Sequence, residues 1–211
     1  MTAPTPDRGD AAGAWDVIVI GGSSGAIEVL NLLMPALPAG LRAAVIVLLH
    51  LPRDRRSLLV DIFRDRCALP LCEAEDQQPI QPGHVYFAPP DYHLLVDRGP
   101  RLALSIGPLV HFSRPSIDVL FQSAADGYGE RLLGVLLSGA NEDGAAGLAA
   151  IHAAGGRAVV QAPDTAAMRA MPDAALARID APEVLAPAAI AALLSQLPAQ
   201  QRPCPPTSTT P

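Results

Sequence analysis

The chain has 211 residues, of which 50% are hydrophobic and 17% are charged, with a formal net charge of −6. This composition indicates one soluble domain with a sizeable core and excludes a largely disordered protein. All fifteen cationic residues are Arg and none is Lys. Schiff-base chemistry on a Lys and a phosphate loop that depends on Lys are therefore excluded. The acidic chain has no basic stripe, so we expect no nucleic-acid partner.

The cysteine pattern and the chain ends point to a cytoplasmic protein. Cys67, Cys72 and Cys204 form no Cys-x-x-Cys or Cys/His pattern, which predicts neither a disulfide framework nor a zinc site. The N-terminus does not resemble a signal peptide, and the apolar runs are far shorter than the roughly 18 residues of a membrane span. We expect a disordered extension at 1–14, one domain at 15–197 and a disordered Pro/Ser/Thr-rich tail at 198–211.

Short apolar runs alternate with stretches of helical periodicity, which predicts a doubly wound α/β fold with a mostly parallel sheet and helices on both faces. Strands are expected at 16–21, 43–49, 84–88, 92–96, 101–105, 132–137, 157–161 and 183–185, and the main helices at 24–37, 57–66, 116–126, 143–154 and 187–197. The close-set strands at 84–88, 92–96 and 101–105 indicate a small antiparallel excursion with a hairpin.

A glycine-rich turn follows the first expected strand. Residues 21–25 read Gly-Gly-Ser-Ser-Gly and match G-x-S-x-G, which in hydrolases presents a serine, here Ser23, on a sharp strand-to-helix turn. A dinucleotide-binding G-x-G-x-x-G is not met. Two other interpretations stay open, namely a turn that only caps the helix with Ser24 as N-cap, and a cradle for a phosphate.

Two more polar residues occupy strand ends. His50 ends the strand at 43–49, and Asp143 lies in the loop after the strand at 132–137. Taken alone, His50 could be a rim histidine and Asp143 a first-turn carboxylate. Parallel strands bring their carboxyl ends to one rim, so Ser23, His50 and Asp143 together predict a nucleophile, a general base and its orienting carboxylate. The order Ser, His, Asp along the chain differs from that of α/β-hydrolases.

The segments that hold these residues resemble the catalytic domain of the chemotaxis protein-glutamate methylesterase CheB. The resemblance covers about 16–180 and rests on VIVIGGSSGA (17–26), VLLHLP (47–52), EAEDQQPIQPGHVYFAPPDYHL (73–94), RPSIDVLFQSAA (114–125), GVLLSGANEDGAAGLAAI (134–151) and AMP (170–172). It implies a doubly wound hydrolase whose triad falls on Ser23, His50 and Asp143. The implied activity is hydrolysis of glutamate γ-methyl esters on methyl-accepting chemoreceptors with release of methanol, together with deamidation of receptor glutamines.

The resemblance implies that the chain needs no metal and no organic cofactor. It also implies that the partner of the chain is a methylated chemoreceptor or a related signalling protein. From their positions, the backbone N–H groups of Ser24 and Ala140 are expected to form the oxyanion hole. Arg114 is expected either to meet an acidic receptor surface or to form a structural ion pair. A non-catalytic docking module of the same fold is the alternative function.

The sequence departs from the family pattern at three places. Ala26 stands where the family usually has Gly, and Ala140 where it has Met, a change that a backbone N–H role would survive. Ser113 stands where the family commonly has His, while His111 lies two residues earlier. Only about 15 residues precede the first strand. We therefore expect a stand-alone form without the receiver domain of the best-known members, and a separate regulatory protein if the activity is regulated.

Overall fold

The computed structural model describes residues 15–199. The predicted disordered segments at 1–14 and 200–211 lie outside the described residues. Pro198 and Ala199, the first residues of the predicted tail, belong to the described residues. The Pro198 carbonyl accepts a hydrogen bond of 3.1 Å from Arg42 N, and Ala199 forms an antiparallel bridge with Leu41.

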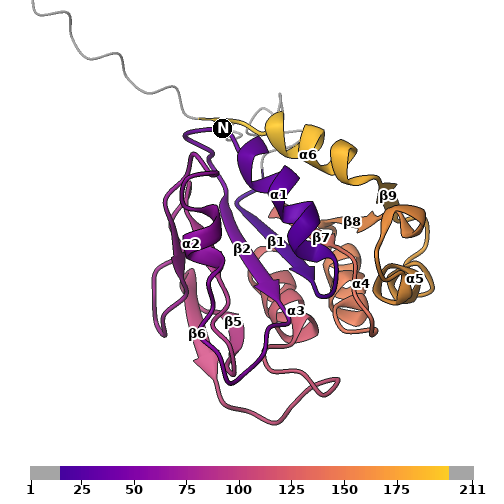
Figure 1. Cartoon of the computed structure of the whole chain (residues 1–211), viewed down its shortest axis with the longest axis horizontal. Helices are drawn as coiled ribbons and strands as arrows, with labels where there is room; N and C mark the ends of the chain where they lie inside the picture. The colour runs from indigo at the N-terminus through magenta and orange to yellow at the C-terminus, as the bar shows by residue number, and fades with distance from the viewer. Residues whose placement is uncertain (1–14, 200–211) are drawn as a thin grey trace, which may run out of the picture.

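Seven strands form one parallel sheet in the order β3-β4-β2-β1-β7-β8-β9 (Figure 1). The strands are β1 (Val17–Gly22), β2 (Ala44–Leu49), β3 (Leu71–Glu73), β4 (Val85–Phe87), β7 (Leu132–Leu136), β8 (Arg157–Gln161) and β9 (Glu183–Leu185). The helices are α1 (Ala26–Ala36), α2 (Leu59–Phe63), α3 (Ile117–Tyr128), α4 (Ala145–Ala153), α5 (Ala170–Leu176) and α6 (Pro187–Ser195). The predicted doubly wound fold is confirmed.

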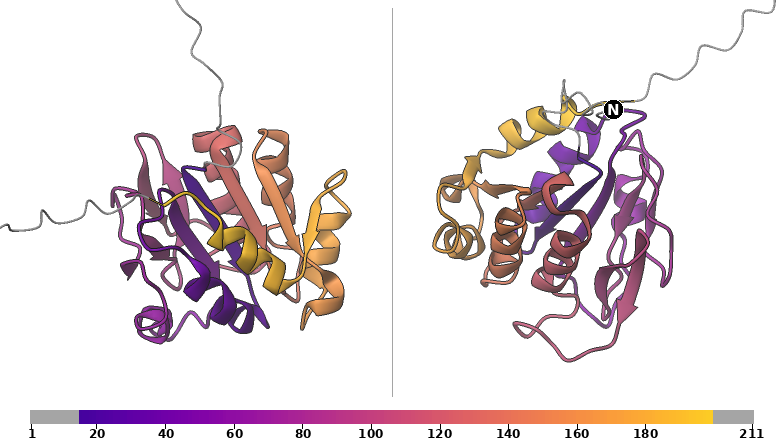
Figure 2. Two further views of the ribbon diagram at one scale, coloured as in Figure 1. Left: turned by 90° about the horizontal axis from the view of Figure 1, so that it is seen from above. Right: turned by 180° about the vertical axis from the view of Figure 1, so that it is seen from behind.

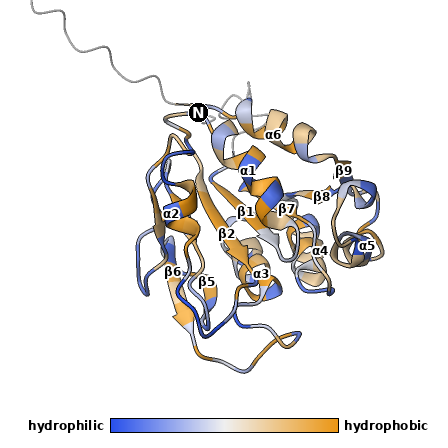
Figure 3. Cartoon of the chain, in the orientation of Figure 1, coloured by the Kyte–Doolittle hydropathy of each residue, from blue (hydrophilic) through white to orange (hydrophobic). Residues whose placement is uncertain are grey.

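Both faces of the sheet are covered, which explains the continuous apolar runs in the sequence. Along β1, Val17 and Val19 face one core, while Ile18 and Ile20 face the other. The first core lies beneath α3, α4 and α5, and the second beneath α1, α2 and α6 (Figure 2). The hydropathy colouring shows the central strands as an apolar layer between these helices (Figure 3). A one-residue slip of a central strand would send each side chain into the opposite core, so side-chain packing rather than a polar–apolar pattern fixes the register.

The middle of the chain differs in part from the prediction. β5 (His93–Asp97) and β6 (Arg101–Ser105) form the expected antiparallel hairpin as a separate two-stranded sheet. The strand expected at 84–88 does not belong to this excursion. It forms β4, which pairs in parallel with β2 on one side and with the unpredicted β3 on the other. The three-residue β3 was missed because a run so short carries no periodicity of its own.

Within residues 15–199, none of the helices combines the length and the apolarity that crossing a bilayer requires.

Candidate active site

The three residues predicted to act together follow neighbouring strands of the sheet. β1 pairs in parallel with β2 and with β7, and Gly22 lies opposite Leu49 in the first of these pairs. Ser23 and His50 are the next residues on the two strands, so the register puts them side by side. The loop that leaves β7 leads to Asp143 just before α4 begins. The sheet therefore gathers the three residues at the carboxyl ends of its central strands, where open α/β folds form their sites.

The turn that carries Ser23 is closely packed. The left-handed Gly25 has φ of 83°, and a Cβ there would lie 2.5 Å from the Ala167 Cβ. Gly25 is also the N-cap of α1, so the alternative in which Ser24 caps the helix is wrong. The buried Ser138 holds the turn from β7, because its carbonyl accepts from Ser23 N at 2.9 Å and its hydroxyl donates to the Ser24 carbonyl at 2.7 Å. These contacts leave Ser23 partly exposed at the rim.

Asp143 is completely buried and its carboxylate is fully engaged. Its four contacts are His50 Nε2 at 2.8 Å, Ser116 Oγ at 2.7 Å, Ile117 N at 2.7 Å and Asp118 N at 3.0 Å. Three of these donors belong to the first turn of α3, whose orphan N–H groups and positive dipole end favour an anion. Burial alone would raise the pKa of Asp143, but the hydrogen bonds from His50, the two backbone amides and Ser116 outweigh it and hold the pKa below its ordinary value.

The geometry of Asp143 also sets the proton on His50. The carboxylate accepts from Nε2, so Nε2 carries the hydrogen and Nδ1 keeps the lone pair that can accept another proton. His50 is mostly buried, with 14% of its side chain exposed. No hydrogen bond joins the Ser23 hydroxyl to His50 among residues 15–199. Such contacts are often looser before substrate binds.

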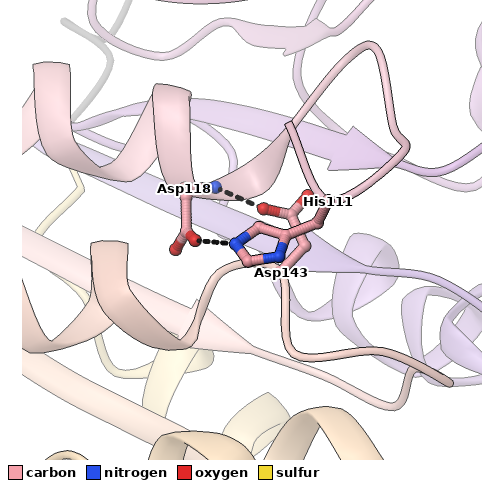
Figure 4. A group of neighbouring side chains, drawn as sticks. All are labelled: His111, Asp118 and Asp143. Carbon is pink, nitrogen blue, oxygen red and sulfur yellow. Dashed lines mark hydrogen bonds and ion pairs between the residues drawn. The ribbon is translucent and has the colours of Figure 1, made fainter. Parts of the chain in front are cut away.

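His111 and Asp118 extend the network around Asp143, with Asp118 linking the other two (Figure 4). His111 Nε2 lies 3.2 Å from Asp118 Oδ2, and Asp118 Oδ1 accepts from Gly147 N at 2.6 Å. Burial, with the nearby charge of Asp143, raises the pKa of Asp118 despite the bond from Gly147 and the neighbouring His111.

One ligand atom from each of His111, Asp118 and Asp143 lies within 4.8 Å of the others. A cation does not fit, because the four contacts of Asp143 already use the lone-pair sites of its carboxylate.

The two residues expected to provide the oxyanion hole are both exposed at this rim. Ser24 follows Ser23 on the turn, and Ala140 lies in the loop between β7 and α4. Within the described part of the chain, neither backbone N–H donates to a protein acceptor. Their positions are therefore compatible with binding a developing oxyanion, and the role stays a prediction.

Arg114 directs its side chain inward. Nε and Nη2 donate to Asp91 Oδ1 at 3.1 and 2.8 Å, and Nη1 donates to the carbonyls of Ile106 and Gly107 at 3.0 Å each. The guanidinium thus ties the segment between β6 and α3 to the residues before β5. Of the two roles expected for Arg114, these contacts favour the structural one.

A small cleft of about 90 Å³ opens beside His50. It is lined by His50, Leu51, Arg53, Phe112, Ser113, Arg114 and Pro115. A larger cavity of about 760 Å³ lies elsewhere, lined in part by Asp16 and Arg131. These two residues precede β1 and β7, so that cavity is at the amino ends of the strands. The cleft at the carboxyl ends contains the candidate base and suits the tip of a single side chain.

Comparison with known proteins agrees with this geometry. The sequence model of the CheB methylesterase family matches residues 18–194. The chain belongs to the CheB methylesterase family. The CheB methylesterase catalytic domain of Thermotoga maritima has a similar structure, with a TM-score of 0.81 and 28% sequence identity over 86% of this chain and 98% of that one.

The chain covers different shares of the length of two relatives. A Leptospira interrogans protein, provisionally named protein-glutamate methylesterase/protein-glutamine glutaminase, is 40% identical over 87% of this chain and 95% of its own length. A Symbiobacterium thermophilum protein-glutamate methylesterase/protein-glutamine glutaminase is 38% identical over 74% of this chain but only 43% of its own length.

Sequence reasoning missed two residues of the site. Ser116 lies in the segment 114–125, and Ser138 directly follows an expected strand, but the sequence patterns predict no role for either. Both are fully buried hydroxyls, one bonded to Asp143 and the other to the Ser23 turn. Their positions at the ends of apolar segments were the available signal, because a buried hydroxyl must find a partner.

Proposed function

We propose that the chain hydrolyses glutamate γ-methyl esters on a methyl-accepting chemoreceptor or a related methylated signalling protein, and releases methanol. The observation that carries the proposal is the buried, fully hydrogen-bonded Asp143, which bonds His50 at 2.8 Å beside a tight serine turn. This is the arrangement of an orienting carboxylate and a general base. The names of the relatives add deamidation of glutamine as a second reaction of the same acyl-transfer type.

The reaction follows from the residues at the rim. Ser23 Oγ attacks the ester carbonyl and gives its proton to His50 Nδ1, while Asp143 stabilises the imidazolium that forms. The low pKa of Asp143 keeps that carboxylate charged throughout. The N–H groups of Ser24 and Ala140 hold the oxyanion until the imidazolium protonates the departing methoxide. Water then attacks the acyl-enzyme by the same steps and frees the glutamate.

Two further features belong to the proposal. Cys67 and Cys72 are free thiols, which supports a reducing compartment, and we place the protein in the cytoplasm. Arg53, Arg55 and Arg56 are exposed in the segment that follows His50. Together with the exposed Asp54 among them, they give this segment a net positive charge beside the candidate site.

Methanol release from a methylated chemoreceptor fragment tests the proposal. The wild-type chain should release methanol, and Ser23→Ala should abolish the release without lowering the unfolding midpoint. Ser195→Ala is the matched control, because it removes an exposed hydroxyl from α6 whose hydrogen bond stays within that helix. Full activity of Ser23→Ala would contradict the assignment of Ser23 as the nucleophile. A wild type that is folded but inactive would favour the non-catalytic docking module.

A further inference from the structure

A strained two-residue turn lies beside the candidate active site. Val110 and Ser113 exchange backbone hydrogen bonds of 3.1 and 2.8 Å, and the residues between them, His111 and Phe112, have φ of 48° and 60°. A hairpin turn with positive φ at both central positions is the type I′ turn, which is usually made by Asn-Gly or Gly-Gly. A bulky residue such as Phe is an outlier in this conformation.

Contacts of neighbouring residues hold the base of this turn. Arg114 binds Asp91 and the carbonyls of Ile106 and Gly107, and His93 Nε2 bonds the Pro108 carbonyl at 2.9 Å. The segment between β6 and α3, at the lower edge of the molecule in Figure 1, is therefore anchored at several points. These anchors explain how the turn is maintained, but they do not involve the Phe112 side chain.

The two central residues of the turn differ in what their side chains do. His111 reaches Asp118 at 3.2 Å and so joins the network around Asp143. Phe112 is 94% exposed, so its ring gains almost nothing from packing within the chain. Gly would adopt the same backbone without strain. Phe112 therefore combines an unfavourable backbone conformation with a side chain that contributes little to the stability of the fold. Strained residues of this kind cluster at functional sites, which indicates that the ring contacts another molecule.

Phe112 stands where a substrate protein must approach. It lines the small cleft together with His50 and Arg53. Two other exposed apolar residues, Ile106 and Leu109, lie on the same segment at 74% and 42% exposure. The exposed arginines at 53, 55 and 56 follow His50. The surface beside the candidate base therefore combines an exposed aromatic ring with charges in which Arg53, Arg55 and Arg56 outnumber Asp54, although the chain as a whole is acidic.

We propose that Phe112 determines specificity for a protein substrate by packing against an apolar part of the acidic segment that carries the methyl-esterified glutamate. The assignment rests on the proposed function. A rigid aromatic side chain loses little conformational freedom on binding, and such residues are common energetic anchors of interfaces. The anchored turn holds the ring beside the cleft, so the contact forms only when the ester-bearing segment lies over His50. A small ester in the cleft meets only the edge of the ring that lines it, whereas a protein segment can also cover the exposed remainder of the ring.

The test compares a protein substrate with a small one. Phe112→Gly should lower kcat/KM for a methylated chemoreceptor fragment by about 10-fold to 100-fold, the range expected when an aromatic anchor is removed. Hydrolysis of N-acetylglutamate γ-methyl ester should fall by a clearly smaller factor than hydrolysis of the fragment, since this ester meets only the part of the ring that lines the cleft. Phe112→Tyr should retain activity on the fragment. Phe112→Gly should unfold close to the urea concentration of the wild type, because relief of strain in the turn is offset by the greater freedom that glycine gives the unfolded chain.

Leu32→Ala is the matched control, because Leu32 is 52% exposed on α1, and it should change neither activity. Equal losses on both substrates, or no loss on the fragment, would overturn the role of Phe112 and leave the proposed function standing. If the wild type hydrolyses neither substrate, the proposed function fails and this assignment fails with it.

Discussion

Replacing Asp143 with Asn removes one acceptor oxygen from the most buried part of the site. In the better amide orientation, the remaining oxygen still accepts from His50 and Ile117, and the Ser116 hydroxyl turns to accept from the new NH₂ group. Asp118 N–H is then left without an acceptor. A buried unpaired donor costs about 1–3 kcal/mol, and loss of an anion at the start of α3 costs about 0.3–1 kcal/mol. We therefore expect a loss of about 1–4 kcal/mol in the free energy of unfolding at pH 7.

The same substitution has a defined pH dependence. The hydrogen bonds around Asp143 outweigh its burial, so its pKa in the folded chain lies below the value in the unfolded chain. Its charged form thus stabilises the fold at pH values above the unfolded pKa of about 3.9. This contribution is lost as the pH falls through the folded pKa. Asn does not titrate, so the stability difference between wild type and variant should narrow below about pH 4.

Urea unfolding monitored by the single tryptophan, Trp15, measures the stability difference at pH 7 and pH 3. Methanol release measures kcat, which should fall about 10⁴-fold because the imidazolium of His50 loses its counter-charge. Asp173→Asn is the control, since this carboxylate pairs with the exposed Arg169 on the surface, and it should change little. The reasoning is refuted if Asp143→Asn keeps kcat within tenfold of the wild type, or if the stability difference widens at low pH.

Three further predictions concern the surroundings of the site. Ser138→Ala removes the hydroxyl that accepts from Met168 N at 2.9 Å and donates to the Ser24 carbonyl. It should cost about 1–3 kcal/mol in urea unfolding and lower kcat up to about 100-fold through misplacement of the nucleophile; unchanged kcat would contradict the support given to the turn. Gly25→Ala should lower the melting temperature more than Gly99→Ala, because both positions have positive φ but a Cβ at Gly99 meets nothing within 4 Å; equal losses would count against the steric argument. Asp118→Asn should destabilise the chain less than Asp143→Asn at pH 7. Burial and the charge of Asp143 raise the pKa of Asp118, so its charged form already opposes folding at pH values above its unfolded pKa. A larger loss at Asp118, measured by urea unfolding, would show that the roles of the two carboxylates are reversed.

The positions of the candidate triad could be predicted because they depend on topology. Parallel strands buried on both faces leave a plain apolar signature, and the polar residue after each strand must then lie at one rim. Ser23, His50 and Asp143 were found in this way, and the sheet register agrees with the predicted proximity of the first two. Asp143 lies next to His50, because its carboxylate bonds His50 Nε2 at 2.8 Å.

Contacts between distant segments could not be predicted from the sequence. Asp143 bonds Ser116 at the start of α3, and Arg114 bonds Asp91. Neither pair of residues has a sequence separation that indicates contact. The turn at His111 and Phe112 has neither Gly nor Asn, so its residue types gave no sign of positive φ. The predicted antiparallel grouping of residues 84–88 failed for a related reason, because a short strand acquires its direction from the partners it finds in the sheet.

Covalent labelling of the folded chain with a serine-reactive phosphonate tests the central claim most directly. The account predicts one adduct on the peptide that contains Ser23, with fragmentation assigning it to Ser23 rather than to Ser24. It also predicts that the adduct is absent in Ser23→Ala and forms far more slowly in His50→Ala, with loss of methanol release in proportion to labelling. A folded wild type that stays unlabelled, or an adduct on another residue that abolishes methanol release, would contradict it.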